Sequence, residues 1–188
     1  YEQGLKGKCL KIAIETVKED FAVKKQIFET LDRLCAPHVL LATNTSSLDA
    51  NLLARETRRQ DKFVWMHYFF PPHKNRAGEY AGTENTSSSS KEIAARYMKL
   101  ARKTPTPLLK YRKGGAANVI FISLLLEAAR MVDEGLEMLD VERAGKETFA
   151  IPVGLLSLME VIGIPLAFSC IESFSDSSCP HDPLYKVY

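Results

Sequence analysis

The sequence has little that points to metal, nucleic-acid or membrane chemistry. Its 188 residues include four cysteines and four histidines, but no CxxC pair and no HExxH motif, so no metal site is expected. The formal net charge of +2 gives no electrostatic reason to expect a nucleic acid or an anionic membrane as partner. No stretch reaches the roughly 20 uncharged apolar residues that a membrane span needs. We therefore expect no metal, no nucleic acid and no membrane among its ligands and partners.

The cysteines are few and dispersed. Cys9 and Cys35 lie beside apolar segments, as buried free thiols commonly do, and Cys170 and Cys179 are far from both. We expect reduced thiols and a cytoplasmic location, although four cysteines can in principle form two disulfides. The first residues resemble neither a signal peptide nor a transit peptide, and both ends suggest a piece cut from a longer chain.

Short apolar runs alternate with amphipathic segments through roughly the first 110 residues. The apolar pattern predicts strands at 10–17, 39–43 and 63–69, an edge strand at 104–111, helices at 18–35, 48–57 and 87–103, and irregular structure at 73–85. We expect Phe21, Val23, Ile27, Leu31 and Leu34 to form the apolar face of the first helix, and Ser47 to cap the second. Strands that alternate with helices over short connections predict an open, mostly parallel α/β sheet.

The remainder of the chain predicts helices only. Residues 116–139 form a helical pattern that is apolar on most of its surface, with Gly135 either ending or interrupting it. Such a helix is buried or packs against a partner. Residues 155–174 predict further helix, broken at Gly163 and Pro165. We expect two domains, residues 1–110 and 111–188, with the boundary near 108–114.

Polar residues stand at the ends of two predicted strands. The run Asn-Thr-Ser-Ser at 44–47 follows the second strand, and His67 closes the third. Ligands bind outside the carboxyl ends of the strands in parallel α/β sheets. A hydroxyl such as that of Ser46 beside an imidazole can polarise a substrate oxygen while the imidazole moves a proton. The alternative interpretation is structural: a turn with a helix cap, and a histidine that only packs.

Residues 12–72 resemble the second half of the NAD-binding domain of L-3-hydroxyacyl-CoA dehydrogenases. That family carries E-A-V-x-E, then a strand ending in S-N-T-S-S-L, then R-P-x-R-x-x-G-x-H-F-F-x-P. The corresponding pieces here stand in the same order: Glu15 with Glu19, NTSSL at 44–48, RQDKF at 59–63 and HYFFPP at 67–72. GGAANVIF at 114–121 resembles the P-G-F-x-x-N-R that opens the family's helical domain, and residues 149–167 resemble its G-x-P-M-G-P-F segment.

The resemblance implies an enzyme that oxidises the 3-hydroxyl of an acyl-CoA and passes a hydride to NAD. The implied fold is α/β, the second half of a Rossmann-type NAD-binding domain followed by an all-helical C-terminal domain. The resemblance assigns His67 as the catalytic base and Glu79, twelve residues later, as the carboxylate that orients it. It further implies substrate contacts from Ser46 and Asn118, and cofactor contacts from Thr16, Glu19, Lys24 and Asn44.

Departures from the family pattern leave other functions open. There is no G-x-G-x-x-G and no acidic ribose ligand after it, features that we expect before the position where this chain begins. Phe70, Gly78, Lys113 and Val119 replace residues that the family commonly has at these positions. One alternative is a related 3-hydroxy-acid or sugar-acid dehydrogenase that acts without CoA, and another is a non-catalytic dimeric member. The apolar helix at 116–139 predicts a homodimer through the helical domain.

Overall fold

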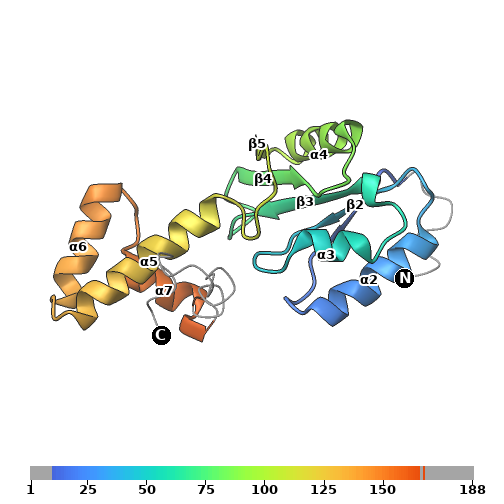
Figure 1. Cartoon of the computed structure of the whole chain (residues 1–188). Coiled ribbons are helices and arrows are strands. Elements are labelled where there is room, and N and C mark those ends of the chain that lie inside the picture. The colour runs from blue at the N-terminus through green and yellow to red at the C-terminus, as the bar shows by residue number, and fades with distance from the viewer. Residues whose placement is uncertain (1–9, 166, 168–188) are drawn as a thin grey trace. The chain divides into compact units, whose positions relative to one another are not determined.

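The computed structural model describes residues 10–165 and 167, and it divides into two compact units (Figure 1). The first unit ends at Gly115, and the second begins at Ala116. This division lies a few residues beyond the expected boundary at 110. Cys35 is a buried free thiol, whereas Cys9, Cys170 and Cys179 lie outside the described residues.

The first unit is built on a five-stranded sheet whose strands follow one another in chain order (Figure 1). The strands are β1 (Ile12–Glu15), β2 (Leu40–Thr43), β3 (Phe63–Tyr68), β4 (Ala77–Gly82) and β5 (Thr104–Pro107). β1, β2 and β3 are parallel, β4 runs antiparallel to β3, and β5 pairs parallel to β4 at the edge. The carboxyl ends of β1, β2 and β3 therefore lie along one edge of the sheet.

Strand β4 corrects the expectation that residues 73–85 are irregular. Its residues pair with β3 from Gly78 to Gly82, so tertiary pairing overrides a local composition that is poor in β-formers. A Cβ at Gly78 would displace the terminal methyl of Met98, so β4 and α4 pack closely at this position. The predicted edge strand at 104–111 is confirmed as β5, which is shorter than expected.

Three helices flank this sheet, and their ends are set by side-chain caps. They are α2 (Phe21–Leu34), α3 (Ala50–Arg55) and α4 (Ser88–Leu100). Asp20 caps α2 by accepting from Val23 N, and Ser87 caps α4. The expectation that Ser47 caps the second helix is wrong: Asp49 does so, accepting from Asn51 N at 2.8 Å.

The core lies on both faces of the sheet, because β2 and β3 are buried on both sides. The face under α2 and α3 holds one cluster: Phe28, Leu41, Ala50, Leu53, Ala54, Phe63, Trp65 and Ala81. The face under α4 holds the other: Leu40, Ala42, Val64, Met66, Ala94 and Met98. Of the face predicted for α2, Phe21 and Leu31 pack against the first of these clusters, while the fully buried residues of the helix are Lys24 and Phe28.

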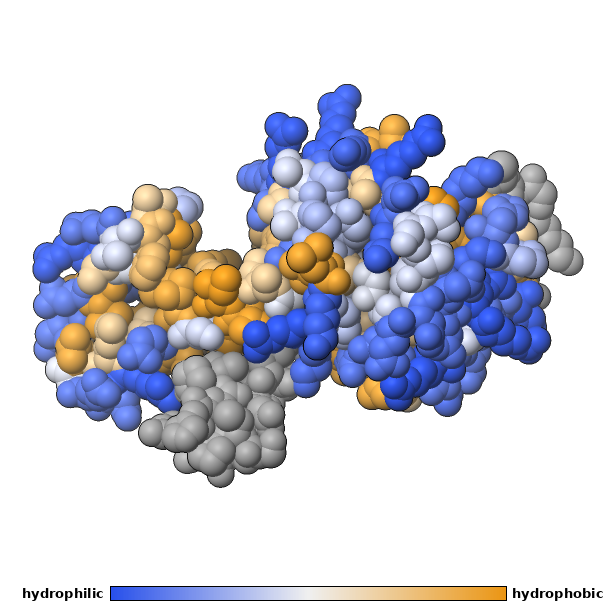
Figure 2. Space-filling model, turned by 45° about the horizontal axis from the view of Figure 1, so that its top comes forward, coloured by the Kyte–Doolittle hydropathy of each residue, from blue (hydrophilic) through white to orange (hydrophobic). Residues whose placement is uncertain are grey.

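The second unit contains α5 (Ala117–Asp133), α6 (Met138–Phe149) and α7 (Leu155–Ile162). Gly135, at φ +99°, follows the end of α5, so the helix predicted over 116–139 is two helices. Gly163, at φ +91°, ends α7 where a break was expected. The unit's core is Ile122, Leu125, Leu126, Ala128, Val141 and Leu155. Figure 2 shows apolar side chains gathered on the visible face of this unit.

Candidate active site

His67 and Glu79 stand directly opposite each other on neighbouring strands. In the antiparallel pairing of β3 with β4, His67 is the Cα partner of Glu79. Directly opposite residues in such a pair have Cβ atoms about 4.5–5.5 Å apart and project from the same face. Both residues are buried, at 5% exposure each. The β3–β4 turn thus brings an imidazole and a carboxylate together although twelve positions separate them in the sequence.

The surroundings of His67 favour its neutral form. Burial of the ring lowers the pKa of His67 from its usual value of 6.5, and it outweighs a hydrogen bond with the Asn44 backbone and the charge of Glu19, which both act to raise it. The side chain of Asn44 also accepts a hydrogen bond from Tyr68 N at 3.0 Å. Asn44 therefore ties the end of β2 to the end of β3 beside the imidazole.

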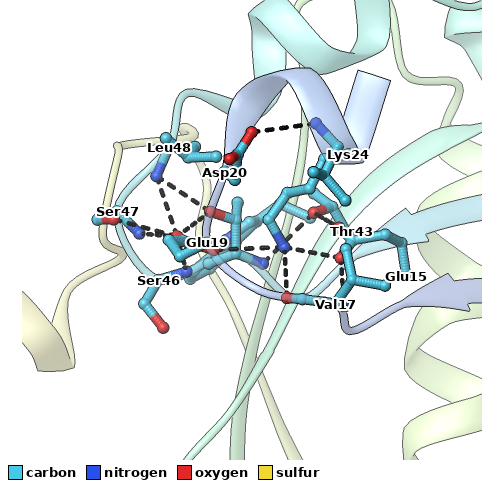
Figure 3. Close-up of polar contacts among 12 residues, drawn as sticks. Glu15, Val17, Glu19, Asp20, Lys24, Thr43, Ser46, Ser47 and Leu48 are labelled. Carbon is cyan, nitrogen blue, oxygen red and sulfur yellow. Dashed lines mark hydrogen bonds and ion pairs between the residues drawn. The ribbon is translucent and has the colours of Figure 1, made fainter. Parts of the chain in front are cut away.

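The loop that follows β2 is held by one carboxylate (Figure 3). One oxygen of Glu19 accepts from Ser46 N at 2.9 Å, Ser47 N at 2.7 Å and Leu48 N at 3.3 Å. The Thr45 hydroxyl donates to the same oxygen. Three successive backbone N–H groups on one acceptor fix the conformation of the loop. The hydroxyl of Ser46 points away from Glu19, which leaves it directed out of this network (Figure 3).

The buried ion pair of Lys24 with Glu15 also contacts the Glu19 carboxylate. Lys24 Nζ lies 2.7 Å from Glu15 Oε1 and 3.3 Å from Glu19 Oε2, and it donates to Val17 O at 3.1 Å. Glu15 also accepts from Val17 N at 2.7 Å and from the Thr43 hydroxyl at 2.8 Å. These bonds join the carboxyl ends of β1 and β2 to the first turn of α2.

The charge of Glu19 is maintained against burial. Burial alone raises the pKa of Glu19, but the hydrogen bonds from Thr45 and Ser47 and the charge of Lys24 outweigh it and hold the pKa below its usual value. Glu19 and Lys24 thus anchor the loop, and the cofactor contact that the sequence assigns to them stays a prediction. Thr16 is exposed, immediately after β1.

Asn118 lies in the first turn of α5, in the second unit. The structure therefore brings together His67, Glu79, Ser46, Asn44 and Glu19 within the first unit, whereas Asn118 belongs to the second. Between residues 10 and 167, the described part of the chain contains no group of three histidines, cysteines or carboxylates that could hold a metal ion. No helix in the same part is long and apolar enough to cross a membrane.

Sequence reasoning missed three residues around this site. Trp65 stacks on His67, and Tyr111 contacts both Trp65 and the loop. Glu15 supplies the buried partner of Lys24. A signal was available only for Glu15, because a carboxylate inside an apolar strand needs a buried partner. Trp65 and Tyr111 have the residue types of ordinary core.

The comparisons with known proteins agree with this geometry. Residues 6–111 match the family model described as 3-hydroxyacyl-CoA dehydrogenase, NAD binding domain, and residues 114–186 match 3-hydroxyacyl-CoA dehydrogenase, C-terminal domain. The chain therefore belongs to the 3-hydroxyacyl-CoA dehydrogenase family. The expected combination of a Rossmann-type NAD-binding fold with a helical domain is confirmed.

Individual relatives match nearly all of this chain but only part of their own length. The mitochondrial hydroxyacyl-coenzyme A dehydrogenase of Sus scrofa is 29% identical over 93% of the chain and 55% of its own length. The peroxisomal fatty acid beta-oxidation multifunctional protein MFP2 of Arabidopsis thaliana is 31% identical over 88% of this chain and 23% of its own length. The crystal structure of (S)-3-hydroxybutyryl-CoA dehydrogenase PaaH1 from Ralstonia eutropha matches with a TM-score of 0.89 at 27% identity. The match covers 99% of this chain and 64% of the PaaH1 chain. The Sus scrofa relative is named as mitochondrial and the Arabidopsis thaliana relative as peroxisomal. A cytoplasmic location of this protein therefore stays a prediction.

Proposed function

We propose that the protein carrying this chain oxidises L-3-hydroxyacyl-CoA to 3-ketoacyl-CoA with NAD, or catalyses the reverse reaction. The observation that supports this most directly is the pairing of His67 with Glu79 at the edge of the sheet where such folds bind ligands. Family membership supports the reaction class, and the relatives named as hydroxyacyl-CoA and 3-hydroxybutyryl-CoA dehydrogenases support the substrate class.

The residues at this edge fit the nicotinamide half of NAD. Thr16 is exposed immediately after β1, and Asn44 immediately follows β2 at the same edge of the sheet. The side chains of these two residues suit the hydroxyl and amide groups of the cofactor. Glu19 and Lys24 would act by holding the loop in place. When bound, NAD supplies the acceptor for the hydride that leaves C3 of the substrate.

His67 acts as the general base in the oxidation. Its neutral imidazole takes the proton of the 3-hydroxyl as the C3 hydride leaves, and the hydroxyl oxygen becomes the ketone oxygen. The low pKa that burial gives His67 keeps the imidazole neutral and able to accept this proton at pH 7. Glu79 stabilises the imidazolium that forms, and it fixes the orientation of the ring.

Two further residues complete the proposed site. The hydroxyl of Ser46 donates to the substrate oxygen as its charge changes, and the amide of Asn118 holds the same oxygen. Ser46 is on the loop that Glu19 fixes, so its hydroxyl is presented on a rigid backbone. Asn118 lies at the start of α5, in the second unit.

The helical unit supports the proposal of a homodimer. Large apolar side chains exposed in this unit include Ile120 at 64%, Leu139 at 82% and Val161 at 68%. A second copy that packs on these residues would remove them from water. Sedimentation velocity over a concentration series should show a dimer of the full-length protein. A monomer at every concentration would rule this proposal out.

The experiment that tests the proposed reaction follows NADH oxidation by the full-length protein with acetoacetyl-CoA. His67→Gln should lower kcat by roughly 10²–10⁴-fold, since positioned proton transfer contributes about that factor. His38→Gln is the matched control, because His38 is an exposed histidine of the same unit. Turnover of free acetoacetate in place of the thioester would favour a 3-hydroxy-acid dehydrogenase. A folded, NAD-binding protein that turns over neither would favour a non-catalytic member.

A further inference from the structure

Four aromatic rings form a column on the face of the sheet that carries the candidate base. The rings of Trp65 and His67 are stacked, with centroids 5.5 Å apart and planes within 8°. The ring of Tyr111 meets Trp65 edge-on at 6.0 Å, and Phe69 meets His67 edge-on at 5.1 Å. Trp65 and His67 are two residues apart on β3, so both side chains project from the same face.

The indole of Trp65 is itself held in place. Its Nε1 donates to Thr45 O at 2.8 Å, and its side chain is completely buried. Thr45 belongs to the loop that Glu19 fixes, so the indole is anchored to the same rigid backbone that presents Ser46. Tyr111 is tied to this loop as well, because its hydroxyl accepts from Ala50 N at 2.7 Å and donates to Leu48 O at 3.3 Å.

Gly115 makes room for both the indole and the carboxylate. A Cβ at this position would lie 2.5 Å from Cη2 of Trp65 and would overlap the carboxylate of Glu79. The φ of +69° at Gly115 also disfavours any L side chain.

We propose that Trp65 is a positioning residue for His67: its indole, anchored by Thr45 and accommodated by Gly115, fixes the plane of the imidazole opposite Glu79. Stacking on the indole restricts the His67 imidazole to a plane nearly parallel to that of Trp65. The cross-strand pairing with Glu79 sets which edge of the imidazole faces the carboxylate. This role rests on the proposed function of His67 as the base. A rotation of the imidazole would misalign the proton transfer, and small displacements of this kind cost up to about 100-fold in rate.

The chain contains a single tryptophan, which gives this contact a spectroscopic signature independent of activity. A cation at the face of an indole perturbs its π system, and a protonated imidazole quenches indole emission. We expect the Trp65 emission of the full-length protein, taken as the difference from Trp65→Phe, to fall as the pH is lowered through the pKa of His67. Glu79 on β4 and Glu19 before α2 are the charged groups that face this pair, so Glu79→Gln should move the midpoint, whereas His67→Gln should abolish the step.

Kinetics then separate positioning from packing. Trp65→Phe keeps a stacked ring and should lower kcat by no more than about 3-fold, whereas Trp65→Leu should lower kcat about 10-fold or more with little change in KM for acyl-CoA. A kcat for folded Trp65→Leu within about 3-fold of the native value would overturn the proposal. If Trp65→Leu does not fold, the pH titration of Trp65 emission is the remaining test. A Trp65 emission that is the same function of pH in the native protein and in His67→Gln would overturn the proposal. A native protein with the emission step but without turnover would contradict the proposed function and not the stacking.

Discussion

Removing the ammonium of Lys24 should destabilise the first unit strongly, because it leaves the carboxylate of Glu15 buried without its cation. Lys24 is 1% exposed and Glu15 is 3% exposed, with 2.7 Å between their charged atoms. Breaking such a pair from one side typically costs 3–5 kcal/mol. Lys24→Met has a similar side-chain length and no charge. Since Glu15 keeps its hydrogen bonds from Val17 N and Thr43, we expect a loss of about 3 kcal/mol, which is roughly a 100-fold change in the folding equilibrium.

Urea unfolding of the full-length protein, followed by far-UV circular dichroism, measures this loss. Lys25→Met is the matched control: Lys25 is the next residue of α2, its side chain is 41% exposed, and its ion pair with Glu56 lies at the surface. That pair should contribute little to stability, because solvent screens exposed ion pairs. The double variant Glu15→Gln with Lys24→Met should recover part of the loss, because a neutral amide is less costly to bury than a lone carboxylate. A loss for Lys24→Met no larger than for Lys25→Met would refute the reasoning.

Three further outcomes follow from the site. The kcat/KM for oxidation, which reports the free enzyme, should fall as the pH drops through the pKa of His67, and because burial holds that pKa down, the midpoint should lie below 6.5; a midpoint above it would contradict the assignment. Glu79→Gln should lower kcat by about 10-fold or more and leave the Kd for NADH, measured by fluorescence titration, within about 3-fold. Glu19→Ala should reduce stability to urea by about 1–3 kcal/mol, since three backbone N–H groups lose their charged acceptor, and an unchanged unfolding midpoint would argue against that anchoring role.

Most of what the sequence could predict about the fold and the site came from the two apolar strands β2 and β3. The sequences of β2 and β3 are continuous apolar runs because both faces of these strands are buried. The predicted ends of the two strands put the 44–47 loop and His67 on the same edge of the sheet. β4 has two glycines among its six residues and no such pattern, so pairing with β3 is what makes it a strand. Glu79 was therefore found through the resemblance and its distance from His67, while its position opposite the imidazole needed the structure.

Lys24 shows the other limit of sequence reasoning. The helical pattern of α2 suggested an apolar face that included Val23 and Ile27, yet the fully buried residues are Lys24 and Phe28. A lysine can occupy a buried position only where a carboxylate is available, and Glu15 provides it from a strand nine residues earlier. Hydrophobic periodicity describes one element at a time and therefore contains no information about such a pair.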